Sequence, residues 1–149
     1  MTSESKTEHV VVGVDGSPAS AAALSWAVRY ARGLGATIRA VLAWHYPAAA
    51  GQAPVGVAPK SVTSEVEHSR DEILEKAISD AIGADPGVPI EREITYGHPA
   101  QVLIDESEAA DLLVVGSRGH GGFKGLRLGS ISMHCVTHAH CPVTVVHAA

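Results

Sequence analysis

Short apolar runs alternate along the chain with stretches that have helical spacing. The runs at His9–Val14, Ala36–Trp44 and Asp111–Gly116 are rich in Val, Ile, Leu and Ala and predict strands. Ile90–Tyr96 alternates apolar and charged residues, which predicts a strand with one less buried face. PVTVVHA, residues 142–148, predicts a last strand. The pattern therefore indicates five strands.

Each connection between these strands contains helix signals. One connection also contains a long segment without them. Ser17 suits the N-cap and Pro18 the first helical position, while Gly33 and Gly35 suit a helix end. Further helices are predicted over about 63–82, from His98 and Pro99 onward, and from about Ser130. Residues 45–62 are rich in Pro, Gly and Ala and predict an irregular connection.

The order of these elements predicts the fold class. Strands that alternate with helices form a parallel sheet covered on both faces. We expect an α/β fold, a single doubly wound domain with a five-stranded parallel sheet in the order 3-2-1-4-5 and four helices. The domain should span residues 9–147, preceded by a disordered N-terminus at residues 1–8.

Composition narrows the class of protein. Aromatic residues make up only 4% of the chain, so Val, Ile, Leu and Ala must build the core, as in buried parallel sheets. The net charge of −5 argues against nucleic-acid binding through a basic surface. No apolar run approaches the roughly 20 residues that cross a bilayer, and the N-terminus has no secretory signal. Cys135 and Cys141 form no CxxC pair, so a reduced, cytoplasmic setting is expected.

Candidate binding chemistry lies in two loops that follow the first and fourth strands. Glycines at 116, 119, 121 and 122 would let backbone N–H groups approach an anion, and Gly129 with Ser130 opens a helix. Asp15 would accept from ribose hydroxyls or bind a metal ion. The alternative is that Asp15 is an Asx-turn residue and the glycine stretch an ordinary flexible turn.

The sequence signals for other kinds of binding or catalytic site are weaker. The P-loop pattern, GxGxxG after the first strand, a GxSxG elbow and HExxH are all missing from the sequence. His134 and His138 would share one helix face near His140 and the two cysteines, which leaves a transition-metal site as an alternative to helix-end and interface residues.

The chain resembles the universal stress proteins, in particular their ATP-binding subgroup. That subgroup carries Gly, two residues, Gly, nine residues, then Gly-Ser or Gly-Thr, and Gly116, Gly119, Gly129 and Ser130 match this spacing. VVGVDGS, DLLVVGSRGHGG and HAHCPVTVV are also similar to the family, from about His9 to Val146.

The resemblance implies a set of binding residues and a partner. It implies that Gly13 and Asp15 lie against adenosine, with Asp15 a possible Mg²⁺ ligand, and that Trp44 contacts adenine mainly through its backbone. The implied phosphate-side residues are Gly116, Ser117, Arg118, Gly119, Gly122, Gly129, Ser130, Ile131 and Ser132. It also implies ATP, with Mg²⁺, as the cofactor and a homodimer paired through the last strand.

Three functions remain open at this stage. The first is a cytoplasmic ATP-binding regulator or sensor of stress responses with an unknown protein partner. The second is a dimeric interaction module that holds no nucleotide. The third is a slow ATPase, for which His120 is the candidate base, while Lys124 and Arg127 could clamp phosphates or be solvated charges.

Overall fold

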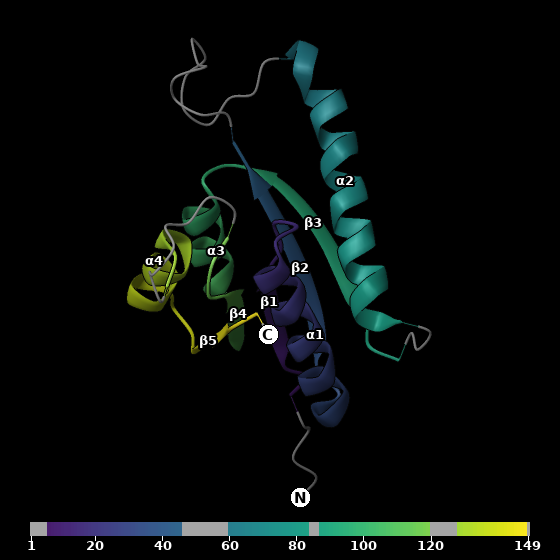
Figure 1. Cartoon of the computed structure of the whole chain (residues 1–149). Helices are drawn as coiled ribbons and strands as arrows, with labels where there is room; N and C mark the ends of the chain where they lie inside the picture. The colour runs from purple at the N-terminus through teal and green to yellow at the C-terminus, as the bar shows by residue number, and fades with distance from the viewer. Residues whose placement is uncertain (1–5, 46–59, 84–86, 120–127, 149) are drawn as a thin grey trace, which may run out of the picture.

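The strands and helices follow the order expected from the sequence pattern (Figure 1). The computed structural model describes residues 6–45, 60–83, 87–119 and 128–148, with only the backbone described over 60–67. The elements are β1 His9–Gly13, α1 Pro18–Leu34, β2 Thr37–Trp44, α2 Lys60–Ile82, β3 Ile90–Tyr96, α3 Pro99–Ser107, β4 Leu112–Gly116, α4 Ser130–His138 and β5 Val143–Val146.

The strands form a five-stranded parallel sheet in the order β3-β2-β1-β4-β5, which confirms the predicted fold class. β1 is central, because Val10 pairs with Ile38 of β2 on one side and Leu112 of β4 on the other. The chain thus leaves β1 toward β2 and returns on the opposite side at β4. The carboxyl ends of β1 and β4 become neighbours at the point where the strand order reverses.

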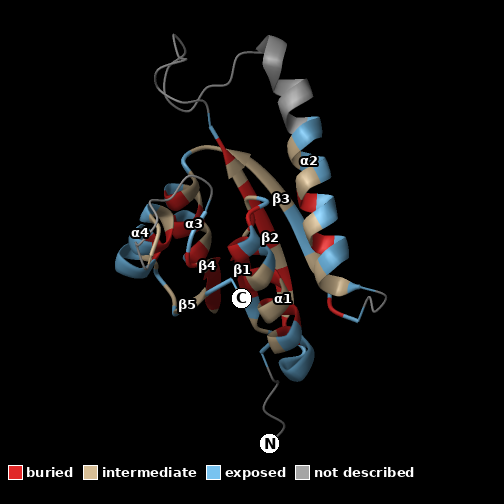
Figure 2. Ribbon diagram, in the orientation of Figure 1, coloured by how far each residue is buried: buried red, intermediate tan, exposed pale blue. Residues whose placement is uncertain are grey.

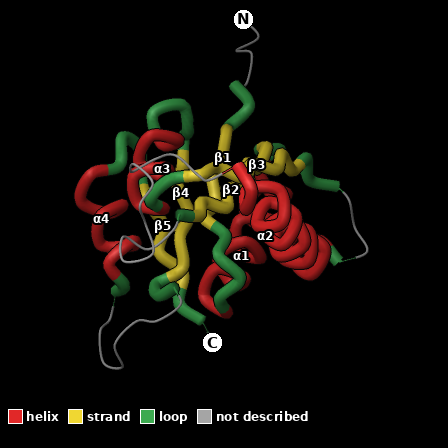
Figure 3. The backbone as a smooth tube through the Cα atoms, turned by 90° about the horizontal axis from the view of Figure 1, so that it is seen from above, coloured by secondary structure: helices red, strands yellow, loops and turns green. Residues whose placement is uncertain are grey.

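Helices cover both faces of the sheet: α1 and α2 lie on one face, and α3 and α4 on the other (Figures 1 and 3). Side chains along each strand alternate between the two faces. Val10, Val12 and Val114 therefore pack with the α1 side, whereas Val11 and Leu113 pack with the α4 side. The central strands are accordingly buried on both faces (Figure 2).

Some element boundaries differ from the expected ones. α2 begins at Lys60, so residues 60–62 are helical rather than part of the predicted connection, of which 46–59 lie outside the described residues. Gly33 lies inside α1, and Gly35 alone ends the helix. Its φ of 67° is left-handed, and its N–H donates to the Ala31 carbonyl, as in a common glycine C-cap.

The N-terminal segment contacts α1 and the turn before β4 ahead of the start of β1. Lys6 Nζ lies 3.2 Å from a carboxylate oxygen of Asp111, and the Glu8 carboxylate accepts a hydrogen bond of 3.0 Å from the Tyr30 hydroxyl. Residues 1–5 of the segment expected to be disordered lie outside the described residues. In the described part of the chain, no helix combines the length and apolarity needed to cross a membrane.

Arg39 fixes α3 relative to the sheet. Its guanidinium lies 2.8 Å from Glu106 of α3, 3.2 Å from Glu91 and 3.3 Å from Glu93 of β3. One cation on β2 thus holds carboxylates from the neighbouring strand and from the helix above it. This matters for function because the opposite end of α3 forms a wall of the candidate site.

Candidate functional site

The candidate site lies at the carboxyl ends of β1 and β4, where the two loops singled out from the sequence meet. In open α/β sheets this reversal point is the usual place for a ligand. Gly13, Asp15, Gly116 and Gly119 all line one hollow there. Its empty volume is about 500 Å³, including the part open to solvent.

A closed set of hydrogen bonds holds the loop after β1. Asp15 Oδ1 accepts from the Ser17 N–H at 2.8 Å, and Ser17 Oγ accepts from the Ser20 N–H at 3.2 Å. Ser20 Oγ donates to the Ser17 carbonyl at 3.1 Å and accepts from the Asp15 N–H at 3.3 Å. Ser17 and Ser20 are buried. Asp15 is therefore an Asx-turn residue, and this turn holds its carboxylate at the hollow.

Two glycines of the loop after β4 permit close approaches. A Cβ added at Gly116 would lie 2.6 Å from the carbonyl carbon of Ala19, in the first turn of α1. A Cβ added at Gly119 would lie 2.7 Å from Asp15 Oδ2. The first approach packs β4 against α1, and the second places the loop backbone beside the carboxylate. Together they bring the two loops into contact.

α4 begins at the edge of the same hollow. Its N-cap, Gly129, supplies no side-chain acceptor, so the first N–H groups of the helix have no side-chain cap. Gly129 has an extended backbone, with φ −72° and ψ 168°, and an added Cβ would make only ordinary contacts of 3.5–3.7 Å. Nothing in the described fold thus requires glycine at 129. Ser132 is buried and donates its hydroxyl hydrogen to the Gly116 carbonyl.

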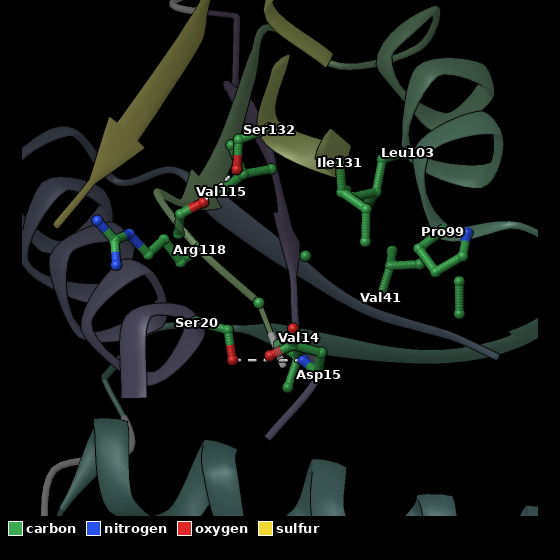
Figure 4. A pocket seen from close by; sticks show the side chains of 14 residues that line it. Val14, Asp15, Ser20, Val41, Pro99, Leu103, Val115, Arg118, Ile131 and Ser132 are labelled. Atoms are coloured by element: carbon green, nitrogen blue, oxygen red, sulfur yellow. Dashed lines mark hydrogen bonds between the residues drawn. The ribbon is translucent and has the colours of Figure 1, made fainter. Parts of the chain in front are cut away.

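Apolar side chains from three elements form a wall of the hollow, and of these residues the sequence analysis placed only Ile131 at the site (Figure 4). Val41 and Ala43 come from β2, Pro99 and Leu103 from α3, and Ile131 from α4. Alternation along β2 could have suggested the first two, because Val41 and Ala43 share the face opposite to Leu42 and Trp44. The sequence contained no signal for which part of that face the helices leave uncovered.

The expected binding residues fall into three groups according to where the structure places them. Those that line the hollow are Gly13, Asp15, Gly116, Arg118, Gly119, Ile131 and Ser132. Gly129 and exposed Ser130 stand at the start of α4, and Ser117 lines an adjoining hollow. Gly122, with His120, Lys124 and Arg127, lies outside the described residues.

Trp44 lies apart from the hollow. Its side chain is buried in the core on the α1 and α2 side and packs edge-to-face against Tyr96, with ring centroids 4.7 Å apart. Its carbonyl accepts a hydrogen bond of 2.8 Å from the Gly97 N–H. The β2 residues at the hollow are therefore Val41 and Ala43 rather than Trp44.

Titratable groups near the site have distinct environments. Burial lowers the pKa of His98, and the nearby His45 and His134 lower it further. Burial raises the pKa of the Cys135 thiol to about 11, so this thiol stays protonated and is a poor nucleophile near neutral pH. Both cysteines are free. Within the described ranges, no three His, Cys, Asp or Glu side chains are grouped so that they could hold a metal ion.

A doubly wound sheet with a glycine-lined hollow at its reversal point is typical of mononucleotide-binding domains. The family model "Universal stress protein family" matches residues 6–147. The chain therefore belongs to the universal stress protein family.

Two curated relatives illustrate the similarity in sequence. Universal stress protein Rv2623 of Mycobacterium tuberculosis is 33% identical over 150 residues, covering 99% of this chain and 50% of the relative. A universal stress protein of Mycolicibacterium smegmatis is 35% identical over 154 residues, covering 97% and 50%. The chain thus spans about half the length of these relatives.

Solved structures share the fold. UspA from Lactobacillus plantarum has a TM-score of 0.74 at 23% identity, covering 96% of this chain and 99% of that chain. A universal stress protein in complex with cAMP has a TM-score of 0.66 at 24% identity, covering 97% and 100%. An Arabidopsis thaliana family protein with AMP bound has a TM-score of 0.57 at 23% identity, covering 95% and 92%.

Substitution by alanine should destabilise the fold at Gly116 much more than at Gly129. Gly116→Ala places Cβ against the α1 backbone, which cannot yield as a side chain would, so the free energy of unfolding should fall by about 1–3 kcal/mol. Gly129→Ala makes only ordinary contacts but replaces a favourable N-cap residue, so it should lower the free energy of unfolding by less than about 1 kcal/mol. Urea denaturation of the two variants checks this, and equal losses would contradict the assigned packing.

Neutral His98 should stabilise the fold. Its Nδ1 accepts from the Ala100 N–H at 3.3 Å and so caps α3. Because the folded-state pKa is lowered, the unfolded chain binds the proton more readily. The stabilisation is therefore complete above the unfolded pKa of about 6.5 and is lost as pH falls through the folded value. His98→Ser keeps a cap acceptor that does not titrate. Its unfolding free energy should fall less than that of wild type between about pH 7.5 and 5.5 in urea titrations, and identical slopes would contradict the role.

Proposed function

We propose that this domain binds an adenine nucleotide, ATP in particular, and acts as a nucleotide-dependent regulator in stress responses. The observation that carries the proposal is the meeting of the Asp15 loop, the Gly116–Gly119 loop and the start of α4 at one apolar-walled hollow. The bound cAMP and AMP in two structural neighbours support an adenine nucleotide as the ligand.

Different residues at the hollow suit different parts of a nucleotide. The apolar wall, with Val41 and Leu103 among its members, suits the flat face of the base. The Asp15 carboxylate suits ribose hydroxyls as an acceptor. Phosphates would meet backbone N–H groups between Gly116 and Gly119 and at the uncapped start of α4, where the helix dipole favours negative charge. A Cβ added at Gly129 would lie 3.7 Å from the Gly119 nitrogen, between the loop after β4 and the start of α4.

Asp15 also fits the expected Mg²⁺. Mg²⁺ in nucleotide sites is usually held by one or two carboxylates together with phosphate oxygens. Asp15 supplies a carboxylate at the hollow, and its Asx turn already fixes one of the two oxygens. Asp15 would hold the ion, which supplies charge neutralisation to the phosphates. The proposal is limited to binding, since His120, the candidate base for hydrolysis, lies outside the described residues.

Calorimetric titration of nucleotide-free protein with ATP and Mg²⁺ tests the proposal. Wild type should bind below millimolar ATP. Gly129→Ala keeps the fold but places a methyl group 3.7 Å from the Gly119 nitrogen, between the loop after β4 and the start of α4, so it should bind at least about tenfold more weakly, a loss of about 1.4 kcal/mol. Gly33→Ala, in the last turns of α1 with nothing within 4 Å of the added Cβ, is the matched control and should bind like wild type.

Two outcomes would contradict the proposal. Absence of binding at millimolar ATP would favour the dimeric interaction module without nucleotide. Wild-type affinity in Gly129→Ala would place any bound nucleotide elsewhere on the protein.

The proposal extends to a homodimer paired through β5, which is an edge of the sheet. The Pro142 and Val146 carbonyls accept from Leu113 and Ser117 on the β4 side. Because successive peptide groups of a strand point to opposite sides, those of Val143 and Val145 face outward. Such an edge favours pairing with another strand. The adjacent helix α4 also exposes Met133 (51%) and Val136 (49%).

Proline at the edge should separate the subunits. Light scattering after gel filtration should give twice the monomer mass for wild type and for Val145→Ala, which keeps the outward N–H. Val145→Pro removes that N–H and should give the monomer mass with unchanged far-UV circular dichroism. A monomeric wild type, or a folded dimer of Val145→Pro, would contradict pairing through β5.

A further inference from the structure

We propose that β3, the sheet edge opposite to β5, binds an extended segment of a different protein in which basic residues alternate with apolar ones. This inference goes beyond nucleotide binding and does not depend on it. β3 is an edge because the strand order is β3-β2-β1-β4-β5. Figure 3 shows β3 at the margin of the sheet, with α2 beside one of its faces. Every residue of β3 is at least partly exposed, unlike those of the central strands.

The outer side of β3 presents unpaired backbone groups in a fixed alternation. The Pro89 carbonyl, directly before the strand, accepts from β2 at 3.0 Å, and the Gly97 N–H, directly after it, donates to β2 at 2.8 Å. Because successive peptide groups of a strand point to opposite sides, the odd-numbered residues face β2. The backbone groups that face outward include those of Ile90, Arg92 and Ile94. Within the described ranges no strand pairs with this side, so an added strand would continue the sheet there.

The side chains of β3 on the α3 side of the sheet are acidic. Glu91 and Glu93 both lie against Arg39 of β2, which also pairs with Glu106 of α3. Three carboxylates thus share one guanidinium, and negative charge exceeds positive charge on this face. The Glu91 side chain is 72% exposed. A carboxylate accepts several hydrogen bonds, so Glu91 can accept from a further cation beside Arg39.

A hollow beside this acidic face offers room for a long side chain. It lies at the amino end of β3, and its empty volume is about 1380 Å³, including open solvent. Val11 and Ile90 contribute apolar surface to its lining, and Glu91 and Glu106 contribute carboxylates. Lysine and arginine combine an apolar stem with a charged head. Such a side chain, projecting from a strand added to β3, would match both parts of the lining.

The opposite face of β3 favours apolar residues. Ile90 and Ile94 are half-buried there and pack against the core on the α1 and α2 side. Arg92 is held by two carboxylates of α2, those of Asp71 and Glu75, so it adds no free positive charge. Side chains of an added strand alternate between the two faces. The segment that fits therefore places basic residues beside the glutamates and apolar residues beside the isoleucines.

The charges also argue against a second copy of this chain as the occupant. Two copies of β3 paired antiparallel about the middle of the strand would place glutamate opposite glutamate, which is destabilising. Charged residues on an edge strand commonly prevent pairing between identical edges. β5, with the sequence VTVV, carries no charged side chain. The two edges thus differ, since β5 suits a second copy and β3 suits a basic partner.

Fluorescence anisotropy with labelled synthetic peptides and the wild-type protein tests the inference. The probe is a peptide of eight residues in which lysine alternates with valine. One control has the same composition in two blocks, lysines and then valines, which keeps the charge but removes the alternation. A second control keeps the alternation but is methylated at two consecutive central peptide nitrogens, one on each edge of the peptide strand. The probe should bind at least about tenfold more tightly than either control.

Charge reversal on the protein tests the acidic face. Glu91→Lys replaces an exposed acceptor by a like charge, so it should weaken binding of the alternating peptide by about threefold to tenfold. Glu108→Lys makes the same change in net charge at an exposed position near His140, outside the hollow, and should leave the affinity unchanged. Far-UV circular dichroism checks that both variants are folded.

Several outcomes would overturn the inference. They are absence of binding of the alternating peptide, equal affinity for either control peptide, and wild-type affinity in Glu91→Lys. An equal loss in Glu91→Lys and Glu108→Lys would reduce the effect to general electrostatics and would overturn it as well. None of these outcomes bears on the binding of ATP, so the failure of this inference and that of the proposed function are distinguishable.

Discussion

The close approach of Gly116 to Ala19 is the contact on which the site depends. The sheet alone makes the ends of β1 and β4 neighbours, but it does not bring the loops that follow them together. Because Gly116 has no Cβ, the end of β4 packs directly against the first turn of α1. That turn carries Ser17 and Ser20, which hold Asp15. The absence of a side chain at Gly116 thereby brings the loop after β4 into contact with the helix turn that holds the Asp15 carboxylate.

These contacts order the polar groups near the hollow in the absence of a ligand. The Asx turn orients Asp15, and Ser132 binds the Gly116 carbonyl from α4. Groups that are already ordered lose little conformational entropy on binding, which favours affinity. A nucleotide, which is apolar at the base and anionic at the phosphates, matches a hollow that combines an apolar wall with the start of α4.

The sequence predicted the larger features because they depend on repeating patterns. Alternation of strands and helices was enough to predict a doubly wound parallel sheet, and the glycine spacing together with Asp15 pointed to the loops that form the candidate site. Apart from Ile131, the apolar wall was missed, since Val41 and Ala43 look like any other core residues and only the positions of α3 and α4 leave them accessible. The resemblance implied that Trp44 contacts adenine mainly through its backbone. Its side chain lies on the opposite face of the sheet, and the backbone contact stays a prediction. The Asx turn of Asp15 and its proposed binding role are compatible, because the turn holds the carboxylate at the hollow.

The most direct test of the account is the mass of whatever small molecule leaves the natively purified protein when it is denatured. The proposed binding of an adenine nucleotide predicts that the released fraction contains adenosine phosphates in an amount comparable to that of the protein. Release of no nucleotide, or of a ligand without adenine, would contradict the central claim.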